Sequence, residues 1–123
     1  MHPLITWTEI PAADLARAKR LYAAVLDATF ADLALGDLAY AMFLPAAAGT
    51  PPAAALVAGP GYRPSTSGVT IYLNGAPDLA AILDRVAAHG GTVLMPKTWL
   101  SPEAGHAGFF TDSEGNRIGL QHS

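Results

Sequence analysis

Cysteine is absent from this 123-residue sequence. Its absence excludes disulfide bonds, thiolate nucleophiles and cysteine-ligated zinc or iron–sulfur sites, so the buried core alone must stabilise the fold. Long hydrophobic runs are missing too. No uninterrupted apolar stretch reaches the roughly 18 residues that a membrane span needs, and no basic segment followed by an apolar one begins the sequence. We therefore expect a cytoplasmic protein that has no membrane partner.

Charge is scarce, at 14% of the residues, and ten acidic against seven basic side chains give a net charge of -3. A protein without an excess of basic residues has no field that would hold a phosphate backbone, so we expect no nucleic-acid partner. Hydrophobic residues make up 51% of the chain. This composition and length favour one folded domain over disorder.

The first half of the sequence predicts one strand, one helix and three further strands. Polar and apolar residues alternate over 4–11 with the period of a strand. After Asp14, apolar residues recur at three-and-four spacing as far as Asp27, which predicts an amphipathic helix with an aspartate near its start. Three predicted strands follow, at 29–35, 38–44 and 53–58.

The second half repeats this order after a connector rich in glycine, proline and serine at 59–67. Alternation over 68–74 predicts a strand, and Pro77-Asp78-Leu79 opens a helix that Gly90-Gly91 ends. Three more strands are predicted at 92–98, 107–112 and 116–121.

An internal repeat accounts for the whole length. Asp14-Leu15-Ala16 recurs as Asp78-Leu79-Ala80, an offset of 64 residues (78 − 14), and the predicted elements recur in the same order. We therefore predict an α+β fold of two βαβββ modules in tandem, at 1–58 and 68–123, joined by a linker at 59–67 into one domain.

With this repeat in place, three stretches resemble the vicinal oxygen chelate superfamily of glyoxalases, bleomycin-resistance proteins and extradiol dioxygenases. They are 10–18 with Tyr22, 90–98, and 110–120, in which Asp112-Ser113-Glu114-Gly115-Asn116 resembles the family's D-P-x-G-N ending. The linker resembles that of a small bacterial branch. The resemblance implies a curled mixed sheet with one helix per module on its outer face.

The resemblance also implies where a divalent metal would be held, on the first and last strand of each module. Those positions fall on Trp7, Leu56, Thr70 and Gly119. Divalent cations need imidazole or carboxylate donors, and these side chains supply none. We therefore expect no metal and no other cofactor. Metal-dependent glyoxalase or dioxygenase activity is disfavoured, and the family's metal-free binders are the better parallel.

Alternation along the strands predicts which side chains share the cavity face. Trp7 and Glu9 lie on one face of the first strand, and Arg117, Gly119 and Gln121 on one face of the last. The predicted ligand-binding residues are Trp7, Glu9, Thr70, Tyr72, Arg117 and Gln121. For Arg117 two roles stay open, an anion anchor and a partner of Glu9.

Three functions are consistent with these residues. The first is a homodimeric, metal-independent protein that binds a small, partly apolar molecule. The second is an isomerase or lyase that uses Glu9 or His106 as general base. The third is an interaction module whose own side chains fill the cavity, with Trp7 over Gly119. We expect Leu100–Gly105 to form a lip over the site and His122 to be exposed to solvent.

Overall fold

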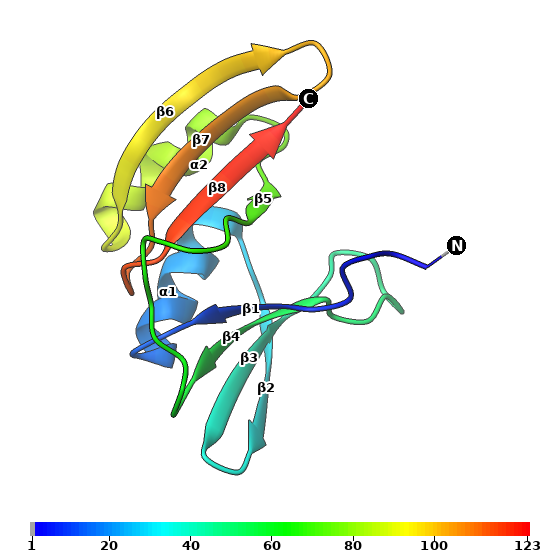
Figure 1. The fold of residues 1–123 in the computed structure, drawn as a ribbon, viewed down its shortest axis with the longest axis vertical. Helices are drawn as coiled ribbons and strands as arrows, with labels where there is room; N and C mark the ends of the chain where they lie inside the picture. The colour runs from blue at the N-terminus through cyan, green and yellow to red at the C-terminus, as the bar shows by residue number, and fades with distance from the viewer. Residues whose placement is uncertain (1) are drawn as a thin grey trace.

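The computed structural model describes residues 2–123 and arranges them as two four-stranded sheets and two α-helices (Figure 1). Each half has the predicted order of strand, helix and three strands. Neither α-helix in this part of the chain is long and apolar enough to cross a membrane. The first half contains β1 (Thr8–Pro11), α1 (Leu15–Leu26), β2 (Phe30–Leu35), β3 (Leu38–Phe43) and β4 (Ala54–Ala58). The second contains β5 (Tyr72–Asn74), α2 (Leu79–Val86), the short 3-10 helix η1 (Ala87–His89), β6 (Thr92–Ser101), β7 (Gly105–Thr111) and β8 (Arg117–His122).

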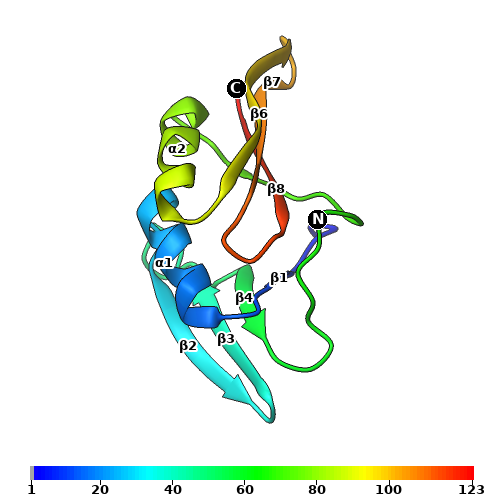
Figure 2. The same cartoon turned by 90° about the vertical axis from the view of Figure 1, so that its left-hand side faces the viewer.

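The two sheets have the same strand order, β1-β4-β3-β2 and β5-β8-β7-β6. In each sheet the first strand of the half pairs in parallel with the last, and the other neighbours are antiparallel. Both helices lie on the same side of the sheets (Figure 2). The predicted α+β class with one outer helix per repeat is therefore confirmed, and the two sheets stay separate rather than closing into a barrel.

Both helices begin at the aspartates that the repeat aligns. The Asp14 side chain accepts a hydrogen bond from the Arg17 backbone N–H at 3.0 Å, and that of Asp78 accepts one from Ala80 at 3.1 Å. Each bond satisfies a backbone donor that has no partner within the helix. The repeated Asp-Leu-Ala therefore marks equivalent helix starts.

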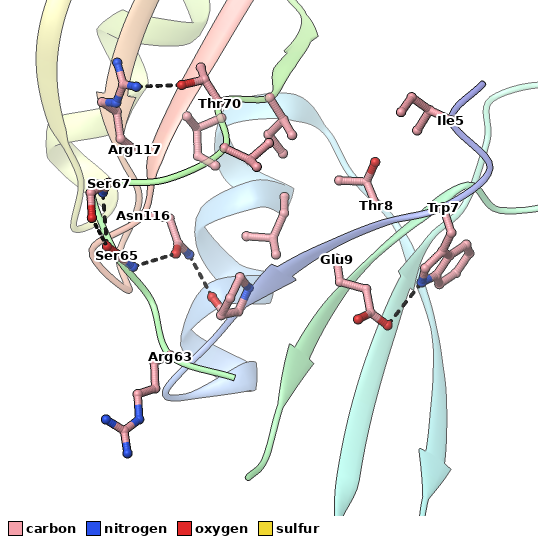
Figure 3. Close-up of a pocket in the computed structure, with 15 residues that line it drawn as sticks. Ile5, Trp7, Thr8, Glu9, Arg63, Ser65, Ser67, Thr70, Asn116 and Arg117 are labelled. Atoms are coloured by element: carbon pink, nitrogen blue, oxygen red, sulfur yellow. Dashed lines mark hydrogen bonds between the residues drawn. The ribbon is translucent and has the colours of Figure 1, made fainter. Parts of the chain in front are cut away.

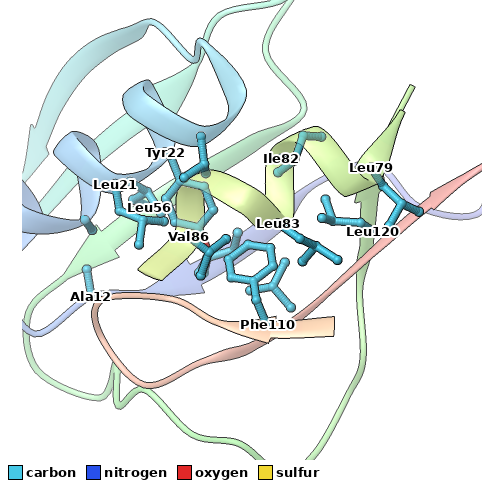
Figure 4. Packing of buried hydrophobic residues seen from close by; sticks show 14 of the residues in the cluster. Ala12, Leu21, Tyr22, Leu56, Leu79, Ile82, Leu83, Val86, Phe110 and Leu120 are labelled. Carbon is cyan, nitrogen blue, oxygen red and sulfur yellow. The ribbon is translucent and has the colours of Figure 1, made fainter. Parts of the chain in front are cut away.

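The hydrophobic core fills the space between the helices and both sheets (Figure 4). Ile10 and Leu56 contribute from the first sheet, and Phe110, Ile118 and Leu120 from the second. Because buried side chains of both halves form one cluster, the two repeats share a single core. Leu56 faces the helices, so its predicted place on the cavity face is wrong.

A buried polar network joins the two halves beside this core. Asp112, only 3% exposed, accepts a hydrogen bond from the Tyr22 hydroxyl at 2.6 Å and one from the Asn116 side chain at 3.0 Å. The same Asn116 amide group donates to the Pro11 carbonyl at 2.7 Å, and its oxygen accepts from the Ser65 N–H at 3.2 Å. The turn between β7 and β8 is thereby fixed to β1, α1 and the linker.

Strand lengths differ from the alternation pattern, because a strand lasts only as long as its partner. β1 starts at Thr8 rather than at residue 4, because its partner β4 begins at Ala54, which lies opposite Thr8. β5 has three residues instead of seven, because it pairs with β8 only over 119–121. β6 extends to Ser101, so part of the predicted lip is strand.

Candidate functional site

A cavity of about 530 Å³ lies between β1 and the start of the second half (Figure 3). Its lining comes from three segments, within 5–11, 63–71 and 116–118. The network around Asn116 holds two of these segments against the end of β1. The cavity is therefore a product of the contact between the two repeats.

Trp7 and Glu9 form one side of the cavity. Trp7, directly before β1, and Glu9, within it, extend to the same side of the chain, with Thr8 on the other, as alternation predicts (Figure 3). The Trp7 indole N–H donates to Oε2 of Glu9 at 3.2 Å, and the Tyr62 hydroxyl donates to Oε1 at 2.6 Å. This bond to Glu9, with burial, raises the pKa of Tyr62 to about 12. Both oxygens of Glu9 are thus held by neutral donors.

Arg117 and Thr70 form the opposite side. Nη2 of Arg117 donates to the Thr70 hydroxyl at 2.6 Å, and its guanidinium lies 5.0 Å from the centre of the Phe109 ring. Across residues 2–123, no salt bridge joins Arg117 to Glu9 or to any other carboxylate. Of the two roles left open for Arg117, pairing with Glu9 is therefore not the one that the structure contains.

The linker supplies cavity residues that the sequence analysis did not single out. Arg63, Ser65 and Ser67 lie on the cavity wall, and the Ser67 N–H donates to the Ser65 hydroxyl at 3.0 Å. The composition of the linker predicted only a connector. The residue that could have indicated the role of the linker is Asn116, because a buried side-chain amide needs hydrogen-bond partners and one of them is in the linker.

Tyr72 and Gln121 lie outside this cavity, along a separate hollow near the end of β8. Tyr72 is opposite Gly119, and a Cβ atom added to Gly119 would come within 2.6 Å of the Tyr72 ring. Tyr72 also packs against Phe109, with ring centres 5.5 Å apart. The space over Gly119 is therefore occupied by Tyr72, and not by Trp7 as the alternative of a self-filled cavity required.

His106 lies opposite His122 near the β6–β7 turn, at the end of the second sheet far from β1 (Figure 1). The ring centres are 5.2 Å apart. His122 is 8% exposed, so the expectation that it faces solvent is wrong. His106 does not reach the cavity, and neither does the turn expected to cover it. Of the two candidate bases, only Glu9 lines the cavity.

The cavity face offers no donor set for a divalent cation. Leu56 faces the helices, and the β4 residue that pairs with Glu9 is Ala55. Ala55 is therefore the residue of β4 to compare with the family's metal-ligand position. Trp7, Ala55, Thr70 and Gly119 still provide one hydroxyl and no imidazole or carboxylate. No group of three or more histidine, aspartate or glutamate side chains suited to a metal occurs among residues 2–123. These residues do not fit the metal of the chelate family.

Comparison with known proteins supports this fold. The sequence model of the Glyoxalase/Bleomycin resistance protein/Dioxygenase superfamily matches residues 4–120. A glyoxylase/bleomycin resistance protein/dioxygenase domain from Frankia sp. has a TM-score of 0.71 at 18% identity, covering 98% of this chain and 92% of that one. A glyoxalase/bleomycin resistance protein from Albidiferax ferrireducens has a TM-score of 0.63 at 19% identity, covering 98% and 99%.

A mutant of glyoxalase I from Zea mays has a TM-score of 0.70 at 16% identity. The match covers 94% of this chain but only 45% of the maize chain, so this protein spans less than half the length of that enzyme. No curated protein sequence matches at a significant level. At these identities the structural likeness concerns the fold alone.

Proposed function

Because the chain belongs to the Glyoxalase/Bleomycin resistance protein/Dioxygenase superfamily, we propose that it binds a small, partly apolar molecule without a metal ion. The binding site is the cavity between β1 and the start of the second half. The observation that carries this proposal is the lining itself. Trp7 and Thr70 occupy positions where the family's metal ligands are expected, and both line the cavity.

The size and chemistry of the cavity support a small ligand. Its volume of about 530 Å³ lies within the range of about 300–1,000 Å³ that small-molecule sites span. Ile5, Trp7, Val69 and Ile71 supply apolar surface. Glu9, Arg63 and Arg117 add charged groups. An apolar wall with few polar groups is the usual composition of such sites. An open space of this size also speaks against a cavity filled by the protein's own side chains.

The test uses the two tryptophans, only one of which lines the cavity. Trp7 lies on the wall, whereas Trp99 is on β6, opposite His106. In Trp99→Phe the emission reports Trp7, and in Trp7→Phe it reports Trp99. We expect compounds from an aromatic fragment library to quench Trp99→Phe saturably and to leave Trp7→Phe unchanged. Absence of saturable quenching in Trp99→Phe, or equal quenching in both variants, contradicts the proposal.

A second candidate function is metal-free proton transfer by Glu9, an isomerase or lyase reaction. The observation that favours it is the Glu9 carboxylate on the cavity wall, held by Trp7 and Tyr62. A carboxylate fixed beside a bound substrate can act as general base. The measurement that discriminates between the two functions is the exchange of protons of a bound fragment with deuterated water, which reports turnover. Exchange that Glu9→Gln abolishes supports the enzyme, and binding without exchange supports the binder.

A further inference from the structure

We propose that the ligand carries a carboxylate group and that Arg117 binds it. This inference rests on the proposed function, because it assigns the charge of the molecule held in the same cavity. It is carried by the charge balance of the lining, the neutral partners of Arg117 and the engagement of Glu9.

The cavity has a positive lining in a protein of net negative charge. Two of the chain's seven basic residues, Arg63 and Arg117, line it, against the single acid Glu9. Elsewhere Arg17, Lys19 and Lys97 form salt bridges with carboxylates, Arg85 donates to the Val25 carbonyl, and Arg20 is exposed. Within residues 2–123 neither cavity arginine has a carboxylate within 4.0 Å. Neither of these two charges is therefore part of an ion pair within the described chain.

Arg117 is oriented by groups that leave its charge intact. A guanidinium has five N–H donors, and in the described chain one side-chain bond is made, to the Thr70 hydroxyl at 2.6 Å. The centre of the Phe109 ring lies 5.0 Å from Cζ of Arg117, a cation–π contact that helps to orient the guanidinium. Held in this way, the remaining donors are pre-arranged for the two oxygens of a planar anion.

Glu9 does not compete for this charge. Its two oxygens accept hydrogen bonds from Trp7 and Tyr62 on the other side of the cavity. A carboxylate ligand would therefore place its charged end at Arg117 and its apolar part against Ile5, Trp7 and Val69. A carboxylate carries one negative charge and matches the one oriented arginine, Arg117. The second arginine, Arg63, is exposed, so no second fixed cation is present for the additional charge of a phosphate.

The experiment compares 2-naphthoate with its neutral isostere 2-naphthamide by isothermal titration calorimetry. We expect the carboxylate to bind at least about tenfold more tightly, because it gains charge-assisted hydrogen bonds. Raising NaCl from about 50 to 300 mM should weaken the binding of the carboxylate and leave the affinity for the amide unchanged, since salt screens only the interaction between charged groups. Both measurements use the wild-type protein, so they do not depend on the folding of a variant.

Variants then locate the charge. Arg117→Gln should remove the preference for the carboxylate, with Arg117→Lys retaining part of it. Arg20→Gln, on the exposed side of α1, is the matched control with the same change in net charge and should retain the full preference. Arg63→Gln should lower carboxylate affinity by about two- to threefold, since it contributes charge without a fixed geometry.

Results other than these contradict different parts of the proposal. Equal affinity for 2-naphthoate and 2-naphthamide contradicts the anion site while leaving the binding function in place. Tighter binding of 2-naphthyl phosphate than of 2-naphthoate contradicts the carboxylate assignment. If no probe gives saturable heat, the proposed function fails together with the anion site. A preference that survives in folded Arg117→Gln removes Arg117 from the site.

Discussion

At the scale of single residues, Asp112 is a carboxylate that is only 3% exposed. Its carboxylate is buried and accepts hydrogen bonds from the Tyr22 hydroxyl and from the Asn116 side chain and backbone. Burial, and to a lesser degree the charge of Asp112, raises the pKa of Tyr22 well above its ordinary value. The phenol therefore stays protonated and donates a hydrogen bond to Asp112. The pair connects α1 to the β7–β8 turn.

Tyr22→Phe should therefore destabilise the fold by about 1–3 kcal/mol, the cost of leaving a buried charged acceptor short of a donor. The measurement is the free energy of unfolding from urea denaturation. Tyr72→Phe is the matched control, because that ring is 53% exposed, and it should change stability by less than about 0.5 kcal/mol. Equal effects of the two substitutions would show that the Tyr22 hydroxyl is not a structural donor.

The pKa of Glu114 leads to a prediction of how the stability of the fold depends on pH. Burial alone raises its pKa, but hydrogen bonds from Arg17, the Asp14 N–H and Ser113 outweigh burial and lower the pKa from 4.5 to about 2. A group with a lowered pKa in the folded state stabilises fully above its ordinary pKa, and this stabilisation is lost as pH falls toward about 2.

We expect the free energy of unfolding to fall between about pH 5 and pH 2, and Glu114→Gln to reduce that fall. One pKa unit corresponds to about 1.4 kcal/mol, and solvent screening at the half-exposed Arg17 lowers the effect to about 1–2 kcal/mol. Denaturation at several pH values measures it. Glu103→Gln, an exposed residue of the β6–β7 turn, should retain the wild-type pH profile. An unchanged profile in Glu114→Gln would exclude this network as its cause.

At the scale of elements, the helix starts should each contribute a local share of stability. Asp14→Ala removes the acceptor for the Arg17 N–H at the start of α1 and should cost about 0.5–2 kcal/mol. Asp84→Ala, an exposed position in the body of α2, should change stability by less than about 0.5 kcal/mol. Thermal unfolding followed by circular dichroism compares them. A milder effect at Asp14 than at Asp84 would mean that the cap is dispensable.

At the scale of the whole molecule, we propose that two copies associate. Large apolar side chains remain exposed, and β2 and β6 are unpaired sheet edges in the described chain. Exposed edges and apolar surface favour association. Light scattering at micromolar concentration should give a mass twice the 12.7 kDa of one chain. A mass of 12.7 kDa would rule the dimer out. The large apolar side chains that are exposed on β2 and β6 are Leu33, Leu35, Val93, Leu94, Trp99 and Leu100.

Metal ions should leave the stability of the molecule unchanged. A ligand that binds the folded state tightly must raise the melting temperature, and the cavity face has no imidazole or second carboxylate to join Glu9. Scans with Ni²⁺, Zn²⁺ or Mn²⁺ should therefore match the metal-free curve. A rise of several degrees, reversed by a chelator, contradicts metal independence. If His106→Ala abolished that rise, the metal would lie at the far end of the second sheet, outside the cavity.

Features set by neighbouring residues could be read from the sequence, because their physical causes are local. The aspartate helix caps, the alternation that places Trp7 beside Glu9, and the order of the two repeats all depend on residues a few positions apart. The ligand positions Trp7, Thr70 and Gly119, which lack metal donors, came instead from the family resemblance and not from a local pattern. At Leu56 a shift of one residue along β4 exchanged the two faces of the strand.

Only the tertiary structure decided what depends on contacts between distant segments. The lengths of β1 and β5 follow from where their partners begin and end. Contacts between distant segments of the second repeat put Tyr72 over Gly119, buried His122, and paired Arg117 with Thr70 and not with Glu9. The sequence by itself thus determined the elements and the chemistry available on each face. The cavity and its free arginine exist because long-range packing brings 5–11, 63–71 and 116–118 together, which no local pattern encodes.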